Sequence, residues 1–234
     1  MHMPLWWNWQ THIAQNDARA TSCRFDSDQR HMSYYRKLPL NPDKELRAYV
    51  IGLAIGDGNL SNPNGRAVCL RITCDDKYIK LRNKVIASLA SLFPKNKVGI
   101  VKNQTNCSNV YVHSNQLEDL LGWKAKGGSK FKQQVSTPIW IKESNKYIIP
   151  YLRGLIETDG SIYSDRGYPM MMFTSIIKKL AEEVKDLIEV LGFKAKLYTI
   201  KPSANSPFNQ QILYHVRLSR DVQKFLDLVQ PDKS

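Results

Sequence analysis

Two acidic residues, Asp57 and Asp159, stand at equivalent positions of a repeated decapeptide. Residues 49–58 read YVIGLAIGDG and residues 151–160 read YLRGLIETDG, so Tyr, Gly, Leu, Asp and Gly recur at a constant offset of 102 residues. Such a repeat indicates an internal duplication in which each copy folds as one unit. When paired units bring two carboxylates together, either the pKa of one carboxyl group rises or the pair binds a cation. We expect a divalent metal ion here.

The elements that must position these carboxylates are two helices. Each decapeptide starts as an apolar run with helical periodicity, and we expect a left-handed cap at Gly58 and Gly160 to end it. Small residues four positions apart share one face of each run, so the two helices can pack with their backbones nearly in contact. Asp57 and Asp159 would then emerge side by side. The residues expected at this helix interface are Gly52, Gly56, Gly154 and Thr158.

The paired decapeptides resemble the LAGLIDADG motif of homing endonucleases, in the single-chain form that carries two motifs. The resemblance extends from about residue 45 to residue 229. It implies an α+β fold with two pseudo-symmetric αββαββα half-domains joined through their motif helices. The antiparallel sheets of such a fold form a DNA-binding saddle.

The resemblance also implies an activity, which is site-specific hydrolysis of phosphodiester bonds in a long asymmetric DNA duplex. In that family this cleavage starts the mobility of an intron or another genomic element. The catalytic residues would be Asp57 and Asp159, each cutting one strand, with Gly56 and Thr158 beside them at the metal. Mg²⁺ is the expected cofactor and Mn²⁺ the expected substitute. Because one chain supplies both motif helices, we expect a monomer.

The chain is strongly basic, with 34 Lys and Arg against 21 Asp and Glu and a formal net charge of +13. This balance favours a polyanionic partner, which is double-stranded DNA or, in a second interpretation, intron RNA. No apolar run reaches transmembrane length, so we expect no membrane partner and a cytoplasmic, nucleoid-associated or organellar location. Four cysteines lack the spacing of a zinc site and are expected to be reduced thiols: Cys23, Cys69, Cys74 and Cys107.

The sequence divides into four segments. Residues 1–31 can be back-translated into DNA that is similar to the D-arm and T-arm of a tRNA gene, so we interpret them as translated tRNA-gene sequence ahead of a start at Met32. A disordered arm, or a Trp-rich arm packed on the domain, is the alternative. The N-terminal LAGLIDADG half spans 45–122, a basic linker spans 123–146, and the C-terminal LAGLIDADG half spans 147–230.

The expected elements of the two halves follow a parallel order, with one strand ahead of the middle helix in the first half and two in the second. The first half contains a strand at 66–73, a helix at 77–92, strands at 97–102 and 109–114, and a helix at 116–121. The second contains strands at 161–164 and 170–175, a helix at 178–191, strands at 194–201 and 211–218, and a helix at 221–229. The apolar side of helix 77–92 is expected to carry Ile79, Ile86, Leu89 and Phe93.

Alternating strands that bury one face present polar side chains on the other. A β-ribbon of this kind fits the major groove of DNA, where Arg and Lys read guanine edges and Asn and Gln read adenine. The alternative is a solvated sheet face. The residues expected to contact DNA, from the sheets and the linker, are Arg66, Arg71, Asn109, Tyr111, His113, Lys126, Lys130, Lys194, Lys196, Tyr198, Gln211, His215 and Arg217.

One departure from the family pattern concerns cleavage. Active members often carry Gln or Asn followed by Lys just after the second strand of a half. The corresponding positions in this sequence are Cys74–Asp75 and Thr174–Ser175, so the lysine is missing. Lys77 and Arg220 are candidates to supply a basic catalytic group in its place.

Three functions stay open at this point. The first is the metal-dependent endonuclease, which could also nick, because Glu157 in the second motif has an apolar counterpart, Ile55, in the first. The second is an RNA maturase that binds intron RNA and assists splicing. The third is a non-catalytic DNA-binding protein of the same fold, which usually carries an added helix-turn-helix; we expect none after Val229.

Overall fold

The computed structural model describes residues 38–63, 65–103, 106–202 and 211–232. The interpretation of residues 1–31 as translated tRNA-gene sequence or as an arm lies outside these residues. None of the described helices has the length and apolar character that would let it cross a bilayer.

The N-terminal half begins with the first motif helix. That helix, α2, is preceded by its N-cap, Asp43, whose carboxylate accepts hydrogen bonds from the amides of Glu45 at 2.8 Å and Leu46 at 3.3 Å. The antiparallel sheet that follows has the strand order β1-β2-β4-β3. The elements of this half are α2 (Lys44–Asp57), β1 (Gly58–Ser61), β2 (Cys69–Asp75), α3 (Ile79–Leu92), β3 (Val98–Lys102), β4 (Cys107–His113) and α4 (Leu117–Leu121).

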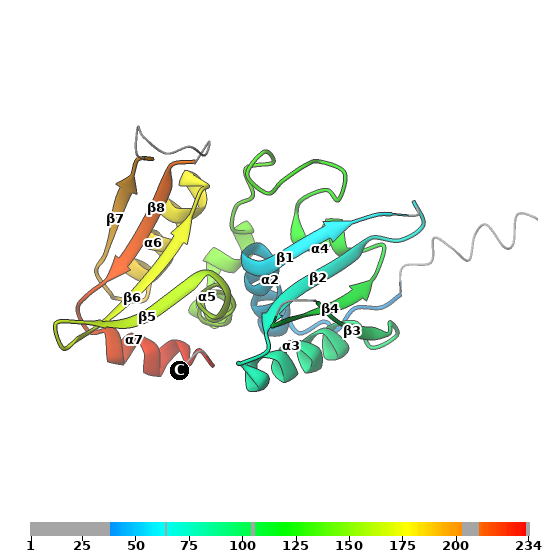
Figure 1. Ribbon diagram of the computed structural model, residues 1–234, viewed down its shortest axis with the longest axis horizontal. Coiled ribbons are helices and arrows are strands. Elements are labelled where there is room, and N and C mark those ends of the chain that lie inside the picture. Colours follow the sequence, from blue (N-terminus) through cyan, green and yellow to red (C-terminus); the bar gives the residue numbers. More distant parts are fainter. Residues whose placement is uncertain (1–37, 64, 104–105, 203–210, 233–234) are drawn as a thin grey trace, which may run out of the picture. The chain divides into compact units, whose positions relative to one another are not determined.

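The C-terminal half repeats this plan (Figure 1). Its antiparallel sheet has the equivalent order β5-β6-β8-β7, with the second motif helix again leading directly into the edge strand. The expected αββαββα order is therefore confirmed in both halves. The elements of this half are α5 (Asn145–Asp159), β5 (Gly160–Asp165), β6 (Tyr168–Ser175), α6 (Lys178–Val190), β7 (Ala195–Ile200), β8 (Leu213–Leu218) and α7 (Val222–Val229).

Helix α3 covers one face of the first sheet and α6 covers one face of the second. The sequence-based assignment of the inner face of α3 is partly wrong. Ile79 is 56% exposed, because the helix begins at this residue and the buried stripe starts one half-turn later at Leu81. The stripe continues through Val85 and Leu89 at the four-residue spacing of one helix face.

The two motif helices, α2 and α5, pack with their backbones in contact. A Cβ atom built on Gly52 would lie 2.3 Å from the carbonyl oxygen of Tyr151, and one built on Gly154 would lie 2.5 Å from the carbonyl oxygen of Tyr49. Both distances are far below van der Waals contact. Only glycine therefore fits at these two positions, and the apolar residues around them form one core that continues into both halves.

The prediction of left-handed caps at Gly58 and Gly160 is wrong. Both residues are extended, with φ of −80° and −85°, and each is the first residue of a strand. Glycine is needed for a different reason, which is space. A Cβ on Gly58 would lie 2.3 Å from the Ala54 carbonyl oxygen, and one on Gly160 would lie 2.6 Å from the Cα of Ile156, because each strand turns tightly against the last turn of its helix.

The linker between the halves is held at both ends by carboxylates. The Ala125 amide donates to Glu118 Oε1 in α4 at 2.8 Å, and the Thr137 amide donates to Glu183 Oε2 in α6 at 2.7 Å. Trp123 is buried, and a 3-10 helix, η1 (Ile139–Glu143), leads into α5. The linker is thus packed against both halves, which fixes the path of its middle part.

Candidate active site

Asp57 and Asp159 are the last residues of the two packed motif helices. Each carboxylate lines a cavity of its own, about 260 Å³ at Asp57 and about 270 Å³ at Asp159. Between them, Gly56 and Thr158 face each other, since a Cβ on Gly56 would lie 1.9 Å from Thr158 Oγ1. The C-terminal ends of both helices, with their partial negative charges, therefore meet between two acidic cavities.

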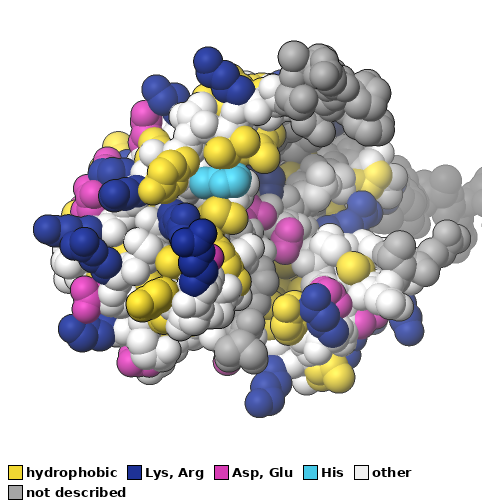
Figure 2. Space-filling model, turned by 60° about the vertical axis from the view of Figure 1, so that its left-hand side comes forward, with side chains coloured by type: hydrophobic (Ala, Val, Ile, Leu, Met, Phe, Trp, Pro, Cys, Tyr) yellow, Lys and Arg dark blue, Asp and Glu magenta, His cyan; other side chains and the backbone are white. Residues whose placement is uncertain are grey.

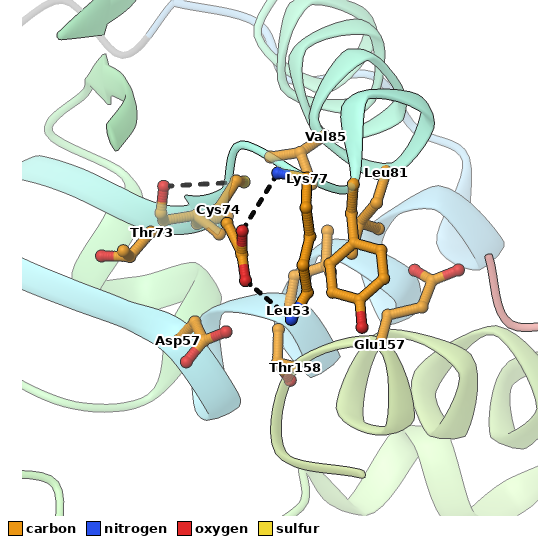
Figure 3. A pocket seen from close by; sticks show the side chains of 12 residues that line it. Leu53, Asp57, Thr73, Cys74, Lys77, Leu81, Val85, Glu157 and Thr158 are labelled. Carbon is orange, nitrogen blue, oxygen red and sulfur yellow. Dashed lines mark hydrogen bonds and ion pairs between the residues drawn. The ribbon is translucent and has the colours of Figure 1, made fainter. Parts of the chain in front are cut away.

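The cavity at Asp57 contains Lys77 (Figure 3). Lys77 Nζ lies 3.0 Å from Asp75 Oδ2, and the Lys77 amide donates to Asp75 Oδ1 at 3.0 Å. The thiol of Cys74 also lines this cavity. Burial, followed by the negative charge of Asp57, raises the pKa of Cys74 to about 11, so the thiol stays protonated at neutral pH.

The cavity at Asp159 contains a lysine from the linker, Lys130. Its ammonium donates hydrogen bonds to the carbonyl oxygens of Ile55, at 2.5 Å, and Gly56, and lies 3.4 Å from that of Ala54. These are C-terminal carbonyls of α2. Burial lowers the pKa of Lys130, while the charges of Asp159 and then Asp57 oppose that shift.

The strand register corrects the alignment of the positions at the end of the second strand of each half. β2 and β6 pair with their preceding edge strands in equivalent registers, which aligns Ile72 with Phe173. Cys74 therefore corresponds to Ser175 and not to Thr174, so the sequence-based alignment was one residue out. Neither position carries an amide or a lysine, and the lysine of each cavity comes from a different part of the chain.

Comparison with known proteins agrees with this geometry. Residues 146–230 match the family model of the LAGLIDADG-like domain. The structure is similar to that of the homing endonuclease I-DmoI in complex with DNA and Mn, with a TM-score of 0.58 at 19% sequence identity, covering 80% of this chain and 96% of that chain. The chain therefore has the LAGLIDADG fold in both halves, and residues 146–230 match the family model itself.

Two further similarities extend the comparison. The N-terminal LAGLIDADG domain of DUF199/WhiA has a TM-score of 0.50 at 11% identity, covering 82% of this chain and 86% of that chain. A DNA polymerase of Thermococcus sp. (strain GE8) is 26% identical over 166 residues, which is 70% of this chain. The chain spans only 9% of the length of that polymerase.

The acidic ends of α2 and α5 suit a divalent ion that takes few protein ligands. Within the described parts of the chain, no three or more His, Cys, Asp or Glu side chains are grouped as a metal cage. Mg²⁺ is commonly held by one or two carboxylates and completes its octahedron with water and substrate phosphates. The ammonium of Lys130 on the Gly56 carbonyl shows that this part of the site already accommodates a cation. Asp57 and Asp159 are therefore the residues that would hold the ion.

Glu157, the acidic residue of the second motif, has a structural environment that the sequence did not predict. Its side chain is buried, at 2% exposure, and in Figure 3 its carboxylate points away from Asp57. Oε2 accepts a hydrogen bond from the Tyr49 hydroxyl at 2.6 Å, while Oε1 accepts from Lys84 Nζ and from the Asp232 amide, both at 2.9 Å. Glu157 thus joins helices of both halves to the C-terminal segment.

Replacing Tyr49 with Phe tests this connection. The variant should lower the free energy of unfolding by about 1.5–3 kcal/mol, because a buried carboxylate oxygen loses its hydroxyl donor. Burial, and then the Glu157 carboxylate, raise the pKa of Tyr49 well above its ordinary range, so the wild-type hydroxyl remains a donor. Urea denaturation measures the difference. Tyr168→Phe, at a tyrosine that is 68% exposed, is the matched control and should unfold like the wild type; equal losses in both variants would contradict the role of Tyr49.

The expected DNA-contacting residues divide into sheet residues and residues outside the sheets. On the first sheet Arg71 is the cross-strand partner of Tyr111, and on the second Arg217 is the partner of Lys196. Figure 2, which brings the C-terminal half forward, shows Lys and Arg side chains spread among apolar ones over the surface of that half. The other sheet residues of the set are Asn109, His113, Tyr198 and His215, and those beside the strands or in the linker are Arg66, Lys126, Lys194 and Gln211.

Several of these side chains already have protein partners. Asn109 accepts a hydrogen bond from Thr73 Oγ1 at 2.9 Å and donates to Asn103 Oδ1 at 3.0 Å. Arg217 pairs with Asp165 at 3.0 Å. Lys130 belongs to the linker, and its ammonium lies at the C-terminal end of α2 and not on a sheet face. Arg220, a candidate basic group, is exposed between β8 and α7 and lines neither acidic cavity.

Proposed function

We propose that this LAGLIDADG protein is a site-specific DNA endonuclease that hydrolyses phosphodiester bonds in a long asymmetric duplex with the help of a divalent metal ion. The observation that carries the proposal is the pair of carboxylates at the meeting helix ends, each lining its own cavity together with one lysine. The homing endonuclease I-DmoI, which shares the fold, has been solved with DNA and Mn, with Ca and with Mg, and this supports the proposal.

The residues have distinct tasks in the proposed reaction. Asp57 and Asp159 hold Mg²⁺ or Mn²⁺, which would polarise the scissile phosphate and lower the pKa of a bound water. Lys77 lies close enough to the Asp57 cavity to bind a phosphate oxygen once it leaves Asp75. The packed glycines of α2 and α5 keep the carboxylates at a fixed spacing, so that the two strands can be attacked at a fixed offset.

The asymmetry of the proposed target follows from the divergence of the two sheets. Tyr111 in the first half and Arg217 in the second occupy equivalent register positions, as do Asn109 and His215. The two members of each pair carry different hydrogen-bonding groups. A good bidentate base contact contributes about 1–3 kcal/mol of discrimination between bases. The halves would therefore prefer different half-sites. Because both motif helices come from one chain, a monomer is sufficient for the reaction.

A specific observation favours a second candidate function, which is nucleic-acid binding without cleavage. The positions at the ends of the second strands are Cys74 and Ser175, without the amide and lysine that are typical of active members. Such a protein would bind DNA, or would bind intron RNA as a maturase. The basic surface suits both DNA and RNA, so only measurements of cleavage and binding separate the three candidate functions.

The test is incubation of the protein with a randomised duplex library and with its own gene's flanking sequences joined without the insert. With Mg²⁺ or Mn²⁺, we expect one discrete double-strand cut at a long site, and no cut with Ca²⁺ or EDTA. Binding of a defined duplex without any cut would overturn the endonuclease proposal in favour of a DNA-binding protein. Tighter binding of the intron RNA than of every duplex would support the maturase.

A further inference from the structure

The ammonium of Lys130 sits at the C-terminal end of the first motif helix. It donates to the carbonyl oxygens of Ile55 and Gly56, the residues that directly precede Asp57. The last carbonyls of a helix have no partner within the helix and carry its negative partial charge. Lys130 therefore satisfies groups that would otherwise be available to another cation.

Both acidic residues attract the same ammonium. Asp159, whose cavity Lys130 lines, and Asp57 each stabilise its charged form. The Lys130 ammonium thus contacts the end of α2, shares a cavity with Asp159 and is also acted on by the charge of Asp57. By contrast, the ammonium of Lys77 in the other cavity pairs with Asp75.

The position of Lys130 depends on the packed linker. The segment that carries it is held by the hydrogen bond from Ala125 to Glu118 on one side and by that from Thr137 to Glu183 on the other. Next to Lys130, Phe131 and Val135 line the same cavity wall. The linker therefore delivers the ammonium to the site with both of its ends fixed.

We propose that Lys130 is a positioning residue that acts as the internal counter-ion of the metal-free site and is displaced when a divalent ion binds. This inference rests on the proposed function. An ammonium and a divalent ion cannot both lie on the Gly56 carbonyl without strong repulsion. The lysine side chain is flexible, so the displaced ammonium can move to a phosphate oxygen of bound DNA. Metal binding is thereby coupled to DNA binding. Binding of the divalent ion to the protein without DNA is disfavoured.

The test measures Ca²⁺ binding to the full chain without DNA. Lys130→Met should bind Ca²⁺ about tenfold more tightly than the wild type in isothermal titration calorimetry, because a positive charge next to the ion is removed. Lys130→Gln keeps an N–H donor for the carbonyls and should show the same gain, which covers the case in which Lys130→Met does not fold. Lys132→Met removes the same charge from an exposed position of the same linker and should bind Ca²⁺ like the wild type.

Thermal unfolding separates this role from a purely structural one. In EDTA, the Lys130 variants should melt below the wild type, and saturating Ca²⁺ should reduce or remove the deficit, because a ligand stabilises most the form that binds it best. An equal deficit with and without Ca²⁺, or Ca²⁺ affinities that do not change in Lys130→Met or Lys130→Gln, would overturn the proposal.

These readouts are independent of cleavage. If the wild type cuts DNA but the Lys130 variants bind Ca²⁺ no better, the counter-ion proposal fails and the endonuclease stands. If no cut is found but the variants bind Ca²⁺ more tightly, the counter-ion proposal stands and the endonuclease fails.

Discussion

Asp57→Asn or Asp159→Asn should abolish double-strand cleavage while leaving DNA affinity within about tenfold of the wild type. Asparagine keeps the size of the side chain but removes the charge that would hold the metal ion. Metal-assisted stabilisation of a transferring phosphoryl group contributes several kcal/mol, so the affected strand should be cut at least about a thousandfold more slowly. Binding should persist because contacts to the phosphate backbone dominate affinity.

The two effects are measured separately. Gel mobility shift in Ca²⁺ gives the affinity of each variant for the selected duplex, and single-turnover cleavage in Mg²⁺ gives the rate. Asp227→Asn, at an exposed position of α7, is the matched control and should cut at the wild-type rate. Wild-type cleavage of both strands by either Asp57→Asn or Asp159→Asn would refute the assignment of these carboxylates.

Gly52→Leu should lower the free energy of unfolding by at least about 3 kcal/mol or prevent folding. The new Cβ alone would lie 2.3 Å from the Tyr151 carbonyl oxygen and 3.1 Å from the Leu155 amide nitrogen. Both are backbone atoms of the facing helix and cannot rotate away as a side chain could. The helices would have to separate, and the spacing of the two carboxylates would change with them.

Urea denaturation followed by circular dichroism measures this loss. Ala90→Leu adds similar volume at an exposed position of α3 and should unfold within about 0.5 kcal/mol of the wild type. A Gly52→Leu protein with a wild-type midpoint would show that the helix backbones do not approach as closely as the structure has them.

Much of the architecture was predictable because the motif repeats. The constant offset between Asp57 and Asp159 indicates two equivalent units, and alternation such as that around Leu70 and Ile72 locates the strands. Helix α6 was predicted at 178–191 and is observed at Lys178–Val190. These features depend on local periodicity, which a single sequence carries directly.

The errors arose where tertiary packing decides the local structure. Gly58 looks like a helix cap from its neighbours, yet its extended backbone is set by the strand that turns against Ala54. β1, at Gly58–Ser61, carries a single large apolar side chain, Leu60, and was not predicted as a strand from its pattern. The prediction of the inner face of α3 was wrong at Ile79, because periodicity alone did not show that the helix begins at this residue.

The contacts that Lys130 and Glu157 make at the site could not be predicted from the sequence, for a different reason. Lys130 lies 74 residues from Gly56 in the sequence, and Glu157 lies 108 residues from Tyr49. No motif marks such pairs, and the basic charge of the linker led to the prediction of Lys130 as a DNA contact. The one usable signal was charge, since Glu157 interrupts an apolar helix and a buried carboxylate needs a partner.

The central claim is that the two carboxylates divide the two DNA strands between them. Its most direct test is cleavage of the selected duplex, labelled differently on each strand, by Asp57→Asn and by Asp159→Asn, with the products separated on a denaturing gel. We predict that the two variants leave opposite strands intact and that the double variant cuts neither. Loss of the same strand in both single variants, or cleavage by the double variant, would contradict the account.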